Sequence, residues 1–162
     1  AHGMAVMAAR EGLELGAELC SDHANLFPLC KEGFSFGREL GFIRDATRGG
    51  LAAIVNEIVS GTDFSIELQE EAIPVSEDVS AVAEILGLNP LEVANEGVLV
   101  MVCSERTTEL LVDRLKTYER GGSAALIGTV MEDNPGKVFL KTRIGGKRRL
   151  DFPRGLLLPR IC

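Results

Sequence analysis

Apolar side chains recur every three to four residues in several stretches, the spacing that places them on one face of an α-helix. The clearest case is residues 51–60, where Leu51, Ile54 and Val55 share a face and Gly61 ends the helix. Weaker versions of the same pattern predict four further helices, over residues 2–15, 26–34, 77–86 and 107–118. We expect Asp22 to cap the second of these and Ser76 to cap the third, because short polar side chains favour that position.

Other stretches alternate apolar and polar residues or are apolar throughout, which is typical of β-strands. Residues 64–68 alternate and predict a half-buried strand, whereas 98–102 are all apolar and predict a central strand covered on both faces. Shorter strands are predicted over residues 41–45, 124–130, 137–142 and 148–150. The sequence therefore predicts one α+β domain over residues 1–152, with a mixed sheet packed by helices, and an extended tail over residues 153–162.

Composition places the chain among globular proteins. Its 162 residues are 46% apolar and 25% charged, enough to bury a core. The longest apolar run, 97–103, is far shorter than the roughly 20 residues that span a bilayer, so we expect no membrane helix. Residues 1–10 have no signal-peptide pattern, and the missing initiator Met suggests a cut fragment. We expect a cytoplasmic protein.

Charge is distributed unevenly along the chain. The net charge of −7 argues against a general nucleic-acid binder. Residues 137–162 hold eight Lys or Arg against Asp151, which leaves 9 basic and 23 acidic residues before them. The body is therefore −14 and the C-terminal end +7. Either the basic end lies over the acidic body, or it forms a surface for a partner or a phosphate.

The cysteines and histidines do not have the spacing of a structural metal site. Cys20, Cys30, Cys103 and Cys162 form no C-x-x-C pair, and the two histidines complete no zinc-type cluster. We therefore expect no bound metal and reduced thiols.

A glycine pair follows the strand predicted over residues 41–45. Backbone N–H groups can converge around Gly49 and Gly50, and the helix that follows offers partial positive charge, which suits a phosphate or carboxylate. Arg48 adds a bidentate donor. The alternative is a tight strand-to-helix turn in which Asp45 or Thr47 caps the helix.

Two further positions are candidates for chemistry. Glu96, after Asn95 and before the apolar run, is a carboxylate that can act as a general base or simply lie in a surface turn. Cys162 is the last residue, on an arm that contains Pro159, and about ten extended residues could carry its thiol some 30 Å. It is either a thiol that visits other sites or an incidental exposed one.

Together these motifs resemble the HypE family of hydrogenase maturation proteins. The likeness is carried by four segments: Asp45–Leu51, Asn56–Ile58, Ala94–Gly97 and Pro159–Cys162. It extends from His2-Gly3-Met4 to the terminus and corresponds to the second half of such a protein. The resemblance implies a fold like the C-terminal domain of aminoimidazole ribonucleotide synthetase, for which the superfamily is named. The cysteine at the end of the tail distinguishes the hydrogenase branch.

The resemblance also implies a reaction. The carbamoyltransferase HypF loads a carbamoyl group on Cys162; ATP then phosphorylates the carbamoyl oxygen, and loss of phosphate leaves an S-cyanide for the iron of nickel–iron hydrogenase. Glu96 matches the residue that takes the N–H proton. The residues that match the border of the nucleotide and tail cleft, and so have positioning roles, are Asp45, Thr47, Arg48, Gly49, Gly50 and Asn95.

What lies outside this chain is implied as well. In the family, ATP and Mg²⁺ are bound mainly by the N-terminal half, so we expect the isolated chain to bind neither and to be inactive. The implied partners are HypF, the HypC–HypD complex and a second copy of the full-length protein, with neither nucleic acid nor membrane. The alternatives are another ATP-dependent member of the superfamily, acting on selenide, thiamine phosphate or a purine precursor, and a nonenzymatic docking module for maturation partners.

Overall fold

The protein is described by a computed structural model that covers residues 1–13 and 19–154. Within these residues there are five α-helices: α1 (His2–Arg10), α2 (Phe27–Phe34), α3 (Gly50–Val59), α4 (Glu77–Leu86) and α5 (Glu105–Lys116). Three short 3₁₀ turns join other elements: η1 (Gly37–Glu39), η2 (Glu70–Ala72) and η3 (Pro90–Glu92). Ser76 caps α4 as predicted, since its hydroxyl accepts a hydrogen bond from the backbone N–H of Val79 at 3.4 Å.

The strands form two separate sheets. Six strands lie in the described residues: β1 (Leu40–Asp45), β2 (Ser65–Gln69), β3 (Leu99–Cys103), β4 (Gly128–Met131), β5 (Val138–Lys141) and β6 (Lys147–Arg149). One sheet is the antiparallel pair β1–β3, and the other has the order β4-β2-β5-β6. Only the β2–β5 pair is parallel, so the larger sheet is mixed. These observations confirm the predicted α+β fold with a mixed sheet, and they add a second small sheet.

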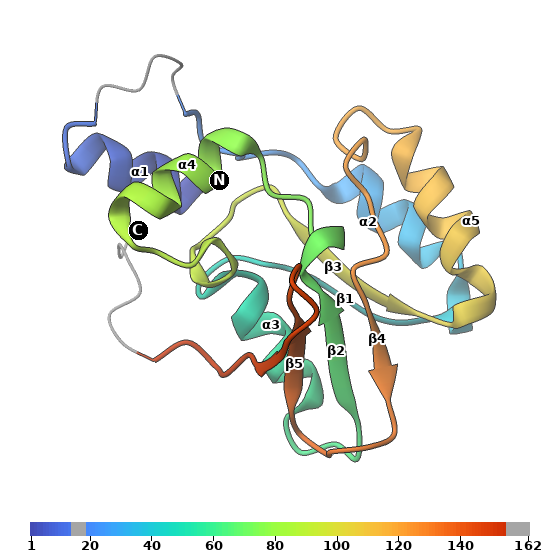
Figure 1. Ribbon diagram of the computed structural model, residues 1–162. Helices are drawn as coiled ribbons and strands as arrows, with labels where there is room; N and C mark the ends of the chain where they lie inside the picture. The colour runs from blue at the N-terminus through green and yellow to red at the C-terminus, as the bar shows by residue number, and fades with distance from the viewer. Residues whose placement is uncertain (14–18, 155–162) are drawn as a thin grey trace.

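Helix α3 forms the centre of the molecule. Its residues 50–55 are all buried, and its apolar face packs on β2 and β5, whose inward side chains include Leu68 and Leu140. Figure 1 shows α3 against one face of the four-stranded sheet, with α1 and α4 side by side at one end of the molecule and α2 and α5 at the other. A second, smaller cluster of buried residues joins α1 to α4.

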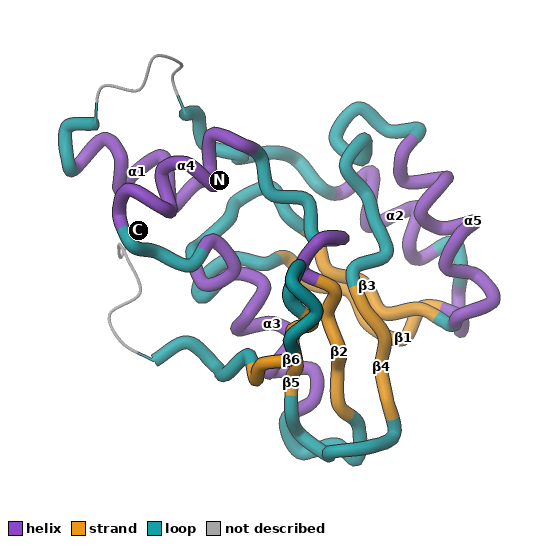
Figure 2. The backbone as a smooth tube through the Cα atoms, viewed as in Figure 1, coloured by secondary structure: helices purple, strands orange, loops and turns teal. Residues whose placement is uncertain are grey.

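The prediction of a central strand over residues 98–102 was wrong. In the structure β3 pairs with β1 alone, and of its five residues only Val100 is buried. An apolar run alone does not reveal how many strands will flank it, because pairing depends on segments far away in the sequence. β6 likewise lies at an edge, beside β5, and Figure 2 shows the chain leaving the sheet from there as a loop.

None of the helices in the described residues is both long and apolar enough to cross a membrane.

Candidate functional site

The pairing of β1 with β3 brings two distant motifs together. The strands are antiparallel, and Asp45 at the end of β1 is the register partner of Leu99 at the start of β3. The turn that follows β1 therefore lies beside the turn that precedes β3. The backbone N–H of Ala46 donates to the carbonyl of Val98 at 2.9 Å, and that of Asn95 donates to the carbonyl of Ala46 at 3.3 Å. The structure thus brings the predicted residues 45–50 and 95–96 together.

The two glycines allow the turn after β1 to pack closely. Gly49 and Gly50 both have positive φ, at +75° and +58°, a conformation that strongly favours glycine. A side-chain carbon at Gly50 would lie 2.5 Å from the carbonyl oxygen of Val93 and 2.7 Å from that of Leu91. Gly50 is therefore required both by its backbone conformation and by the approach of the segment before Asn95.

The structure does not support the interpretation that a side chain caps α3. Gly49 is the N-cap residue, and neither Asp45 nor Thr47 makes a side-chain cap hydrogen bond. The turn is closed by the backbone instead, with the N–H of Gly50 donating to the carbonyl of Thr47 at 3.0 Å. Thr47 is half-buried, whereas Asp45 and Arg48 are exposed, so these charged groups are free to meet a ligand at the surface of the turn.

Asn95 connects the two turns through its side chain. Its amide nitrogen donates to the carbonyl oxygens of Ala46 at 3.3 Å and Val93 at 3.2 Å. Its amide oxygen accepts a hydrogen bond from the backbone nitrogen of Ala1 at 2.8 Å. The contacts of Asn95 are therefore to its own chain, and they hold the glycine turn and the turn before β3 in register.

Glu96 has a fixed backbone and an available carboxylate. Its backbone N–H donates to Oδ1 of Asp22 at 3.0 Å, and its carbonyl accepts from the N–H of Ala24 at 3.3 Å. The side chain is half-buried and makes no hydrogen bond or ion pair with the rest of the described chain. A carboxylate in this state can accept a proton from a ligand placed over the two turns.

Asp22 anchors this turn, a role that the sequence did not reveal. Its Oδ1 also accepts from the N–H of His2 at 2.9 Å. A side-chain carbon at Gly97 would lie only 1.8 Å from the carbonyl oxygen of Asp22, so the two backbones are in direct contact.

The prediction that Asp22 caps the second helix was wrong. Helix α2 begins at Phe27, and its N-cap residue is Leu26. The side chain of Asn25, not that of Asp22, accepts a hydrogen bond from the N–H of Phe27, at 3.0 Å. Asp22 lies too far before the helix to cap it and bonds instead to backbone N–H groups from elsewhere in the chain.

The base of the C-terminal tail runs past the glycine turn. The side-chain amide of Asn56, on α3, donates to the carbonyl of Leu150 at 3.0 Å and holds the end of β6 against the helix. Pro153 is buried, and its Cγ would lie 3.7 Å from a side-chain carbon at Gly49. Cys162 itself lies outside the described residues. The segment that leads to it therefore starts beside residues 45–50.

The basic end of the chain pairs only in small part with the acidic body. Lys147 forms an ion pair with Glu67 of β2 at 2.6 Å and lies over the ring of Phe139 at 4.5 Å. Arg149 pairs with Asp151, which belongs to the basic end itself, at 2.8 Å. One ion pair among the described residues, Lys147–Glu67, therefore supports the interpretation that the basic end lies over the acidic body. Most cations of this end remain exposed.

Among the described residues there is no group of three or more His, Cys, Asp or Glu side chains placed to hold a metal ion. Cys20 is exposed, and Cys30 and Cys103 are half-buried free thiols.

The chain is similar to known proteins over nearly its whole length. The chain is 40% identical over 161 residues to the carbamoyl dehydratase HypE of Azotobacter vinelandii, and 42% identical to that of Escherichia coli K12; each alignment covers 99% of this chain and 47% of the relative. The chain thus spans about half the length of the curated relatives it matches.

Solved structures agree as well. The crystal structure of E. coli HypE matches with a TM-score of 0.90 at 41% identity, over 99% of this chain and 49% of that one. A HypE structure in complex with ATP matches with a TM-score of 0.91 at 35% identity, and HypE in a HypE–HypF complex with 0.88 at 36%. These two cover 99% and 94% of this chain, and 49% of each matched chain.

Residues 1–141 match the family described as AIR synthase related protein, C-terminal domain. Because this match covers most of the chain, the protein belongs to the AIR synthase related family and carries its C-terminal domain.

Proposed function

We propose that this chain is the C-terminal part of a hydrogenase maturation protein that converts a carbamoyl group on its terminal cysteine into thiocyanate. The cyanide so formed is destined for the iron of nickel–iron hydrogenase. The observation that carries the proposal is the meeting of three parts at one place: residues 45–50, residues 95–96 and the base of the tail that ends in Cys162. The similarity to carbamoyl dehydratases over 99% of the chain supports the same reaction.

The reaction begins on the sulfur of Cys162, which receives a carbamoyl group and becomes an S-thiocarbamate. The amide oxygen is a poor leaving group, and transfer of the γ-phosphoryl group of ATP to it makes a good one. One N–H proton is lost in that step and the second when phosphate departs with the C–O bonding pair. The nitrogen then shares three pairs with carbon, and the products are S-cyanide, ADP and phosphate.

Glu96 is the proposed base for the N–H protons. Its carboxylate makes no hydrogen bond or ion pair with the described residues, and its backbone is held on both sides by Asp22 and Ala24. A base that removes a proton from nitrogen must lie within hydrogen-bonding distance of it. The proposal requires the S-carbamoyl group to reach this carboxylate, and the chain that leads to Cys162 leaves the described residues close to Gly49.

The remaining predicted residues position the reacting groups. Arg48 and Asp45 are exposed at the surface of the turn, where the guanidinium can pair with a phosphate. Thr47, Gly49, Gly50 and Asn95 shape that turn through the contacts described above. Phosphoryl transfer depends mostly on positioning and charge stabilisation, which such a wall can provide.

In this proposal, ATP and Mg²⁺ are bound chiefly by residues that lie outside this chain. At the two turns the described residues offer the glycine pair and the exposed Arg48, and no cluster of carboxylates among the described residues is placed for a metal ion. By itself the chain should therefore hydrolyse ATP poorly and bind nucleotide weakly. Calorimetry and a phosphate-release assay on the isolated chain test this, and robust Mg²⁺-dependent turnover would overturn it.

The proposed partners follow from the reaction. HypF loads the carbamoyl group, in keeping with the HypE–HypF complex known for a similar protein. The HypC–HypD complex accepts the cyanide, and the full-length protein forms a homodimer in the cytoplasm.

The experiment that tests the proposal uses the full-length protein that contains this chain, with HypF, carbamoyl phosphate and ATP. Peptide mass spectrometry should find modification at Cys162 and none at Cys20, Cys30 or Cys103. Cys162→Ala should abolish both loading and thiocyanate formation. An acceptor other than Cys162 would contradict the assignment of the carrier thiol.

A further inference from the structure

The C-terminal end of the described chain presents a group of cations with few carboxylate partners. Seven lysines and arginines lie from the residue before β5 to the last described residue, and all are exposed: Lys137, Lys141, Arg143, Lys147, Arg148, Arg149 and Arg154. Of these seven, only Lys147 and Arg149 form ion pairs with described residues. The positive charge of this end is therefore exposed on the described chain, whose residues 1–136 carry a net charge of −14.

Several of these cations surround a hollow in the surface. The hollow has a volume of about 540 Å³ and is lined by Glu92 and by residues 148–154. Leu150 and Pro153 are buried in its lining, while Phe152 is 50% exposed. Arginine and exposed aromatic side chains over an apolar base are enriched where proteins bind one another.

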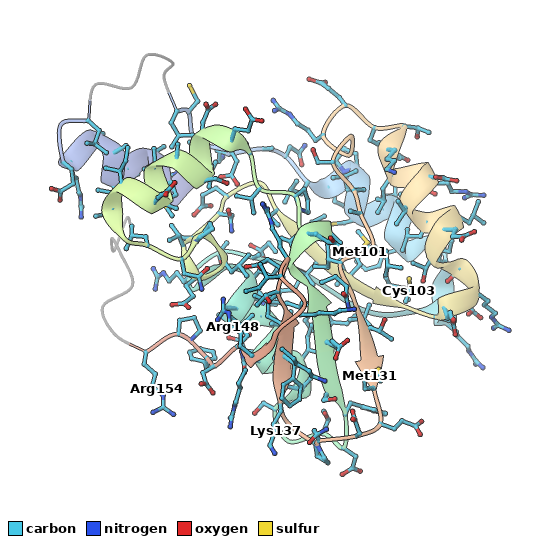
Figure 3. The ribbon with its side chains drawn as sticks, viewed as in Figure 1. Met101, Cys103, Met131, Lys137, Arg148 and Arg154 are labelled. Atoms are coloured by element: carbon cyan, nitrogen blue, oxygen red, sulfur yellow. The ribbon has the colours of Figure 1, made fainter. Side chains whose placement is uncertain are left out.

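The hollow lies at the base of the tail. Figure 3 shows Arg148 and Arg154 on the side of β5 from which the C-terminal segment leaves, and Pro153 contacts the region of the glycine turn. Eight residues separate this point from the end of the chain, so the thiol of Cys162 lies within about 29 Å of the hollow even if the tail is fully extended. A partner bound in the hollow would have the thiol within reach.

We call the exposed cations around this hollow, Arg148, Arg149 and Arg154, the basic tail base. We propose that the hollow and the basic tail base form a docking surface for an acidic face of the enzyme that loads the thiol. The inference rests on the proposed function, which requires Cys162 to enter the active site of another protein. An acidic partner is repelled by residues 1–136, whose net charge is −14, and attracted to this surface, which turns the tail toward the partner.

The lining favours a protein over a small phosphate. Glu92 and Asp151 face the same hollow, so its interior is only weakly positive and would repel a compact multiply charged anion. The unpaired cations on β5, on β6 and in the turn between them extend the positive charge over a wider area, which suits a broad acidic surface. Phe152 adds apolar contact that a phosphate does not use.

The test compares two double variants of the full-length protein with equal changes in charge. Arg148→Glu with Arg154→Glu reverses two of the three charges of the basic tail base. Lys116→Glu with Arg120→Glu makes the same change at the end of α5 and just beyond it, on exposed residues away from the tail. Stopped-flow association with HypF is measured at low and at high salt, and circular dichroism checks that both variants are folded.

We expect the tail-base variant to associate at least about 10-fold more slowly at low salt, with a weaker salt dependence, and to approach the wild-type rate at high salt. The α5 variant should stay within about 2-fold of wild type. Equal rates for the tail-base variant and wild type, or equal losses in both variants, would overturn the docking surface. A loss of ATP or inorganic phosphate affinity with normal HypF association would assign the surface to phosphate and also overturn it.

Loading of Cys162 separates this inference from the proposed function. At saturating HypF the tail-base variant should still be carbamoylated at Cys162, because docking accelerates the encounter and leaves the thiol intact. Normal loading with normal association would reject only the docking surface. Absence of loading in the wild-type protein would instead reject the proposed function.

Discussion

The carboxylate of Asp22 holds the backbone of Glu96, whose N–H donates to Oδ1 at 3.0 Å. The same oxygen accepts from the N–H of His2 at 2.9 Å, so one side chain joins the start of α1 to the turn before β3. Hydrogen bonds to an ionised acceptor are stronger than those between neutral groups. The position of the proposed base is therefore set by a residue 74 positions earlier in the chain.

Replacing Asp22 should slow dehydration without preventing loading. In the full-length protein, Asp22→Ala removes the acceptor and lets the turn at Glu96 shift, which should slow thiocyanate formation by about 10- to 100-fold, because small misplacements of catalytic groups are costly. Asp22→Asn keeps an oxygen acceptor and should retain most of the rate. Single-turnover intact-mass measurements report both steps. An alanine variant as fast as Asp113→Ala, an exposed control on α5, would show that the anchor is dispensable.

Gly50 provides a test of the glycine turn. Gly50→Ala places a carbon 2.5 Å from the backbone carbonyl of Val93 and also imposes a positive φ, so the free energy of unfolding should fall by at least about 3 kcal/mol. Gly61→Ala is the matched control, because Gly61 has a φ of +72° but open space around it. It should lose only about 1 to 2 kcal/mol, the cost of the left-handed conformation. Equal losses in urea unfolding would mean that the close approach at Gly50 has no energetic consequence.

The ion pair between Glu39 and Arg106 should make stability depend on acid pH. The hydrogen bonds from Arg106, followed by that from Ser104, lower the pKa of Glu39 from 4.5 to about 2. The unfolded chain therefore binds a proton at a higher pH than the folded one, so the contribution is complete above pH 4.5 and is lost as the pH falls to about 2.

Glu39→Gln removes this dependence. The difference in the free energy of unfolding between wild type and Glu39→Gln should be largest near neutral pH and should shrink as the pH approaches 2. Urea titrations at a series of pH values measure it. Glu105→Gln, an exposed neighbour with no ion pair among the described residues, serves as control. A difference that stays constant with pH would contradict the assignment to Glu39.

Much of the secondary structure could be predicted because its signals are local. The apolar spacing of α3 and the cap at Ser76 lie within the helices that they specify, and both predictions are confirmed. The glycine turn and Glu96 were also recognisable from sequence, as a compact motif after a strand and a carboxylate before one.

The remaining features depend on pairing between distant segments. The run 98–102 has the composition of a central strand, but its neighbours are decided by where β1 and the helix pair α2 and α5 lie. Asp22 has the sequence context of a helix cap, and nothing near it indicates that its acceptors will face His2 and Glu96. An anchor of this kind becomes visible only when the fold brings its donors together.

The central claim is that Glu96 is the base that converts the loaded carbamoyl group to thiocyanate. Glu96→Gln in the full-length protein keeps the size of the side chain and removes its ability to accept a proton. Intact-mass analysis before and after ATP measures both steps, with thermal melting as the check on folding. Loading at Cys162 should be normal, while thiocyanate formation should slow by about 10²- to 10⁴-fold. Near-normal thiocyanate formation would contradict the account and leave Glu96 as a turn residue, and loss of loading itself would show a structural or docking role instead.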